Sequence, residues 1–111
     1  MRPPAVAGLF YPENANELRN DVNGYIAGCS PRAAVAVRPK ALIVPHAGYQ
    51  YSGSVAGFAY RRLRDWSADV RHVVMIGPSH RVAIRGLAVP SVDTFETPLG
   101  SVPIDAAGRS R

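Results

Sequence analysis

The sequence has a single cysteine, Cys29, a single lysine, Lys40, and no long apolar run. One cysteine cannot form a disulfide within the chain, and because no base lies near it in sequence, we expect an inert, buried or half-buried thiol. No stretch reaches the roughly 18 apolar residues that a membrane helix needs, so we expect no membrane partner. Residues 1–8 are too short and too rich in proline for the apolar core of a signal peptide. These absences predict a cytoplasmic protein.

The basic residues are almost all arginines, and they give the chain a net charge of +5. Such an excess is compatible with a nucleic-acid surface. The only dense cluster, at residues 61–64, falls at the end of a predicted helix, where cations complement the helix dipole. The other arginines are scattered and do not alternate with aromatic residues, as a base-stacking surface requires. We therefore expect no nucleic-acid partner.

A first helix is predicted over residues 15–27. Asn14 followed by Glu17 resembles a capping box, and Gly28 is a suitable stop. Apolar side chains recur every fourth residue and share one helix face. They are Leu18, Val22 and Ile26.

Two short apolar runs, residues 41–44 and 72–77, flank a second predicted helix. Continuous apolar runs without alternation are typical of strands buried on both faces of a parallel sheet. The helix between them should begin near Ser52 or Ser54 and end near Trp66. Together these elements predict a right-handed βαβ unit with parallel strands.

The remainder of the chain reads as short extended pieces. Residues 86–90 resemble a third strand, and residues 95–97 and 101–104 flank a tight turn at 98–100. Asp105 can begin another helix. With 111 residues, 47% of them hydrophobic, the chain can form at most one small globular domain.

The predicted fold class is α/β, with a partial sheet built around the parallel βαβ unit. A sheet with two buried strands needs cover on both faces, and two helices provide little of it. We therefore expect residues 1–111 to be the N-terminal portion of a larger α/β domain.

A histidine follows each of the two predicted strands, His46 after the first and His80 after the second. Carboxyl ends of parallel strands are where open α/β sheets bind ligands, so these histidines should meet at one sheet edge. Neutral imidazoles are common metal ligands, although a facial triad needs a third protein ligand. The alternative is that each histidine caps its own turn. His72 begins a strand at the opposite edge and is expected to be structural or solvent-exposed.

Three further side chains near the histidines are candidates for substrate binding: Tyr49, Tyr51 and Arg81. The two tyrosines lead into a helix N-terminus, which favours anions, and Arg81 can clamp a carboxylate or phosphate. The expected ligand is a small anionic or phenolic molecule. Alternatively the tyrosines pack against the neighbouring loop and Arg81 is solvated.

Four ordered motifs carry a resemblance to a known family. They are AGLFYP at residues 7–12, VPHAGYQYSG at 44–53, IGPSH at 76–80 and FETPLG at 95–100. In this order they resemble the Memo family, whose prokaryotic members are called AmmeMemoRadiSam system protein B. The resemblance covers essentially the whole chain.

The resemblance implies the fold of class III extradiol ring-cleaving dioxygenases, which use non-haem iron(II). It implies that His46 and His80 are metal-site residues, with iron(II) or another divalent or redox metal as cofactor. The family's remaining site residues, including a cysteine, lie later in the chain, and Cys29 does not match that cysteine. Partner proteins of a radical-SAM system are also implied.

Three functions remain open from the sequence. The first is a Memo-like protein with a dioxygenase-like metal site, which would be an oxidoreductase when full length. The second is a non-catalytic module that binds a peptide or phospholigand through the same cleft. The third is a truncated product without a function of its own.

Overall fold

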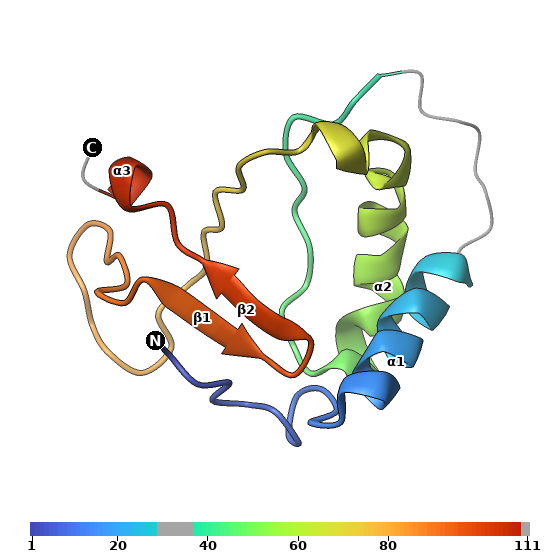
Figure 1. Cartoon of the computed structure of the whole chain (residues 1–111), viewed down its shortest axis with the longest axis horizontal. Coiled ribbons are helices and arrows are strands. Elements are labelled where there is room, and N and C mark those ends of the chain that lie inside the picture. The colour runs from blue at the N-terminus through green and yellow to red at the C-terminus, as the bar shows by residue number, and fades with distance from the viewer. Residues whose placement is uncertain (29–36, 110–111) are drawn as a thin grey trace.

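The computed structural model describes residues 1–28 and 37–109 (Figure 1). Two long helices lie side by side, and a two-stranded hairpin lies across the molecule from them, with residues 37–48 and 70–80 running between (Figure 1). In chain order the elements are α1 (Ala15–Ala27), α2 (Tyr49–Arg61), the 3-10 helix η1 (Arg64–Asp69), β1 (Thr94–Thr97), β2 (Gly100–Pro103) and α3 (Ala106–Arg109).

Helix α1 has the bounds that its sequence predicts. The Asn14 side chain accepts hydrogen bonds from the backbone N–H groups of Asn16, at 2.9 Å, and Glu17, at 3.2 Å. These bonds satisfy two of the donors that a helix start leaves unpaired. Of the predicted apolar face, Leu18 is buried, with 4% of its surface exposed, whereas Val22 and Ile26 are half-buried.

Helix α2 packs against α1 through small residues. Ser52, Gly53 and Gly57 are its buried positions. A Cβ atom at Gly53 would lie 2.6 Å from the ring of Tyr25, and one at Gly57 would meet the backbone carbonyl of Tyr25. The two helices can therefore approach closely only because these positions carry no side chain. The larger apolar side chains of α2 are not buried in this contact: Val55 is 58% exposed and Phe58 is 55% exposed.

The predicted bounds of the second helix were wrong at both ends. The helix begins at Tyr49, with Gly48 as its N-cap. Ser52 does not cap it, because its hydroxyl donates to the carbonyls of Ala47 and Gly48 from within the first turn. The helix ends at Arg61, and after a turn the tighter 3-10 helix η1 follows over Arg64–Asp69.

The parallel βαβ unit is not confirmed. Within the described part of the chain, residues 41–44, 72–77 and 86–90 form no strand, and the only sheet is the antiparallel pair β1–β2. Ile43 is 100% exposed and Val74 is 87% exposed. Strands of a parallel sheet are held by neighbouring strands and by helices on both faces, and these runs have neither here. The α/β character of this chain rests on its helices and the hairpin.

The hairpin and the short last helix follow the sequence prediction. Thr94 pairs with Pro103 and Thr97 with Gly100, which has the positive φ of 126° that a glycine tolerates. The N-terminus joins the edge of β1, since Arg2 N donates to Thr94 O at 2.8 Å.

The arginine cluster lies at the end of a helix, as the sequence predicts. Arg61 lies in the last turn of α2 and donates to the carbonyl of Ile26 at 3.2 Å, so it links the two long helices. Cys29 lies outside the described residues. No helix in residues 1–28 or 37–109 has the length and apolar composition needed to cross a bilayer.

Candidate metal site

His46 and His80 lie together. Their Nε2 atoms are 3.0 Å apart, and their ring centroids are 5.2 Å apart with the planes inclined at 32°. Both residues are exposed. The two histidines are therefore close together, as the sequence predicts. The edge of a parallel sheet, which was expected to position them, is not seen in the described residues.

The segment that carries His46 is fixed by two hydrogen bonds just beyond it. The buried Ser52 hydroxyl donates to Ala47 O at 2.8 Å. The backbone N–H of Tyr49 donates to Phe10 O at 2.7 Å. The first bond ties the loop to α2 and the second ties it to the N-terminal segment. The loop next to His46 is thus held to α2 by one bond and to the N-terminal segment by the other.

A turn stabilises the backbone around His80. The hydroxyl of Ser79 donates to Val82 O at 2.5 Å, and this bond closes a turn that contains His80 and Arg81. A serine hydroxyl that bonds a nearby backbone group is a common device for fixing such turns. The side chain of His80 is left exposed and faces His46.

The imidazole pair can act in two ways. One Nε2 can donate to the other if the two rings adopt opposite tautomers, or both can be acceptors directed at one cation. Within residues 1–28 and 37–109 there is no group of three or more histidine, cysteine or acidic side chains that could hold a metal ion. His72 stands apart from the pair, with Nδ1 3.7 Å from Asp105 Oδ2.

Tyr49 lies in an aromatic cluster. Its ring centroid is 5.6 Å from that of Tyr11 and 6.2 Å from that of Tyr25. Burial raises the pKa of the Tyr49 phenol above its ordinary value of 10.0. Repulsion from other tyrosine oxygens adds to the effect in the order Tyr11, Tyr60 and Tyr25. This packing corresponds to the alternative that the sequence left open for Tyr49.

The other two candidate substrate-binding residues are accessible. Tyr51 is 76% exposed, and Arg81 is exposed without a hydrogen-bond partner among the described residues. The first turn of α2 is a poorer anion site than its sequence suggests. Tyr49 N already donates to Phe10 O and Tyr51 N to Gly48 O.

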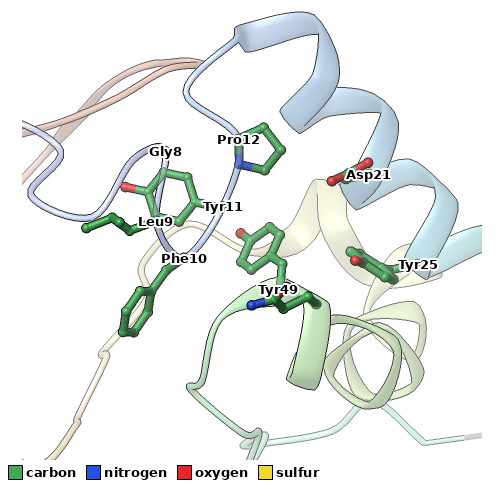
Figure 2. A pocket seen from close by; sticks show the side chains of 9 residues that line it. Gly8, Leu9, Phe10, Tyr11, Pro12, Asp21, Tyr25 and Tyr49 are labelled. Atoms are coloured by element: carbon green, nitrogen blue, oxygen red, sulfur yellow. The ribbon is translucent and has the colours of Figure 1, made fainter.

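A shallow pocket next to the aromatic cluster escaped the sequence analysis (Figure 2). Tyr49 lies between Tyr11 and Tyr25, and Asp21 lies one turn before Tyr25 on α1 (Figure 2). The available signal was the spacing of Asp21 and Tyr25, which places them on one helix face. The motif at residues 7–12 gave no indication of which ring Tyr11 would meet.

Comparisons of the sequence with protein families and with individual proteins indicate the same family. The profile of the Memo-like protein family matches residues 2–110. A MEMO1 family protein of Aquifex aeolicus is 40% identical over 111 residues, which are 100% of this chain and 39% of that protein. The memo-1 homolog of Caenorhabditis elegans is 36% identical over 104 residues, 94% of this chain and 28% of that protein. This chain thus spans well under half the length of these relatives, and it belongs to the Memo-like protein family.

Proposed function

We propose that this chain supplies His46 and His80 as two ligands of a metal site in a Memo-like protein, similar to the sites of non-haem iron(II) dioxygenases. The observation that supports this most directly is the 3.0 Å separation of the two Nε2 atoms. The proposed cofactor is iron(II) or another divalent or redox metal.

The Nε2 separation fits two ligands of one ion. Nitrogens that each lie about 2.0–2.1 Å from a shared ion are about 3.0 Å apart when they subtend roughly 90° at it. The spacing therefore allows both nitrogens to bind one ion, as two members of a facial triad would do, with a third protein ligand still required.

The chain's own residues would set the chemistry of such a site. A ligating Nε2 must be unprotonated, so each neutral ring would carry its proton on Nδ1. A redox metal held by these residues would supply a centre for oxygen chemistry. Because the chain spans 39% of the Aquifex protein and 28% of the Caenorhabditis protein, the complete ligand set and any dioxygenase activity are proposals about a whole Memo-like protein.

Arg81 and Tyr51 are the proposed substrate contacts. Both are exposed, and Arg81 directly follows His80. A guanidinium can bind a carboxylate or phosphate in bidentate fashion, and a phenol ring can stack on an aromatic ligand. The same contacts would serve a non-catalytic peptide or phospholigand site. Oxygen uptake by a metal-loaded, full-length family member given catechol-like substrates would separate the two functions.

The test of the metal site is an anaerobic titration of this chain with cobalt(II), read by visible absorption, followed by competition with iron(II). We expect His46→Ala and His80→Ala each to weaken binding by more than about tenfold, which is the lower end of the loss seen for residues that merely support a ligand. His72→Ala is the matched control, because His72 is exposed and contacts Asp105. Equal affinity in all four proteins would refute the shared site.

A further inference from the structure

Three tyrosine rings from separate parts of the chain enclose one side of the pocket described above (Figure 2). Tyr11 comes from the N-terminal segment, Tyr25 from α1 and Tyr49 from the start of α2. The Tyr25 and Tyr49 planes are nearly perpendicular, at 82°, and the Tyr11 and Tyr49 planes are inclined at 45°. Because the three rings lie in different planes, a ligand in the pocket can contact a ring face from one side and a ring edge from another.

Among the residues that the structure describes, the only charged one that lines this pocket is an acid. Asp21 is exposed and contributes its carboxylate to the wall, whereas no described arginine, lysine or histidine does so. The chain as a whole carries +5, so a wall with only negative charge is a local exception. The remaining lining side chains are uncharged: Leu9, Phe10, Tyr11, Pro12, Tyr25, Tyr49 and Gln50. The charge distribution therefore favours a cation over an anion.

Two backbone hydrogen bonds hold the loop beside the pocket in place. Gly8 N donates to Tyr11 O at 2.8 Å and closes the loop that presents Tyr11. Tyr49 N donates to Phe10 O at 2.7 Å and fixes this loop against α2. A site that is formed in advance loses little conformational entropy when it binds.

The pocket has a volume of about 210 Å³. Sites for drug-sized molecules are larger, at about 300–1,000 Å³. Its size suits a compact group with few atoms. Aromatic faces together with a carboxylate bind an alkylated ammonium better than a bare metal ion, since the rings attract the diffuse charge and contact the methyl groups.

We propose that Tyr11, Tyr25, Tyr49 and Asp21 form a binding site for the methylated ammonium group of a small organic cation. The rings supply cation–π attraction and apolar contact, and the carboxylate supplies the countercharge. This site shares no residue with the histidine pair and adds a second, independent function to the chain.

Choline and 3,3-dimethylbutan-1-ol provide a direct test, because the two have the same shape and differ in charge. Each is titrated into this chain while the NMR signals of the tyrosine rings are followed. We expect choline to bind at least about fivefold more tightly than the neutral alcohol, a ratio in the range of a solvent-exposed cation–π contact. Equal affinity for the two compounds, or no saturable shift with choline up to about 100 mM, would overturn the proposal.

Variants then identify the groups responsible. Tyr11→Phe keeps the ring and should bind choline within about twofold of the parent, whereas Tyr11→Leu should lose about threefold to tenfold. Asp21→Asn should lose a similar factor and remove most of the preference over the alcohol. Asp65→Asn, an exposed acid on η1, is the control and should change neither value. Unchanged choline binding in both Tyr11→Leu and Asp21→Asn would refute the site.

Discussion

The Nε2 atoms of His46 and His80 lie 3.0 Å apart although the two residues are 34 positions apart in sequence. Neither histidine is placed by a strand. His46 immediately precedes a loop that Ser52 and Phe10 fix in position, and His80 lies in a turn closed by Ser79. The geometry of the pair therefore depends on the loops and turns around it, and substitutions there should disturb the pair without touching either ring.

Ser52→Ala should weaken both stability and metal binding. The substitution removes the buried hydroxyl that donates to Ala47 O and Gly48 O. A lost hydrogen bond of this kind costs about 1 kcal/mol, and the freed loop should present His46 less precisely. Urea unfolding and the cobalt(II) titration measure the two effects. Ser54→Ala, at an exposed position two residues later in α2, should leave metal binding unchanged and be neutral or slightly stabilising; equal values for the two variants would contradict the role of Ser52.

Gly57→Ala should destabilise the packing of α1 against α2. A Cβ atom at this position meets the carbonyl oxygen of Tyr25, and backbone atoms cannot rotate out of the way. Overpacking of this type costs about 1–3 kcal/mol. Gly24→Ala is the opposite case, because no described residue beyond its own stretch of α1 lies within 4 Å of its Cβ position. It should stabilise the helix by about 0.5–1 kcal/mol. Thermal unfolding of both variants gives the sign of each effect, and a Gly57→Ala protein as stable as the parent would refute the close approach.

The stability of the chain should fall at alkaline pH because of Tyr49. Its pKa is raised in the folded state, so the unfolded chain releases the phenolic proton first as the pH rises through 10.0. From there up to the folded pKa, the unfolded state binds fewer protons, and the free energy of unfolding decreases. Urea unfolding between about pH 8 and 11 should show this loss in the parent and a smaller loss in Tyr49→Phe. Tyr51→Phe, at an exposed position, should behave like the parent. Identical slopes in all three proteins would exclude Tyr49 as the cause.

Asn14→Ala should shorten or weaken α1. The Asn14 side chain accepts from two backbone N–H groups at the start of the helix, and loss of such a cap costs about 1 kcal/mol. Asn20→Ala, within the same helix, should instead be neutral or stabilising, because alanine has the higher helix propensity. Circular dichroism during urea unfolding compares the two. A loss of stability that is the same for both would show that the cap is not responsible.

Local signals in the sequence determined the elements whose stabilising groups are close neighbours in the chain. Asn14 and Gly28 fixed the bounds of α1, and the turn at residues 98–100 fixed the hairpin. In each case the hydrogen bonds that define the element join residues a few positions apart, so the pattern alone was sufficient. The sequence also singled out His46 and His80, and its motifs indicated the family.

Tertiary structure alone decided the contacts between distant segments. The start of α2 depends on Phe10, whose carbonyl binds Tyr49 N, and its buried face depends on the approach of Tyr25 to glycines. The apolar runs at 41–44 and 72–77 have strand-like composition, but composition cannot supply the neighbouring strands that a parallel sheet requires. The Nε2 spacing of the histidines and the packing of Tyr11 and Tyr25 against Tyr49 likewise follow from how separate segments pack, which no local pattern in the sequence specifies.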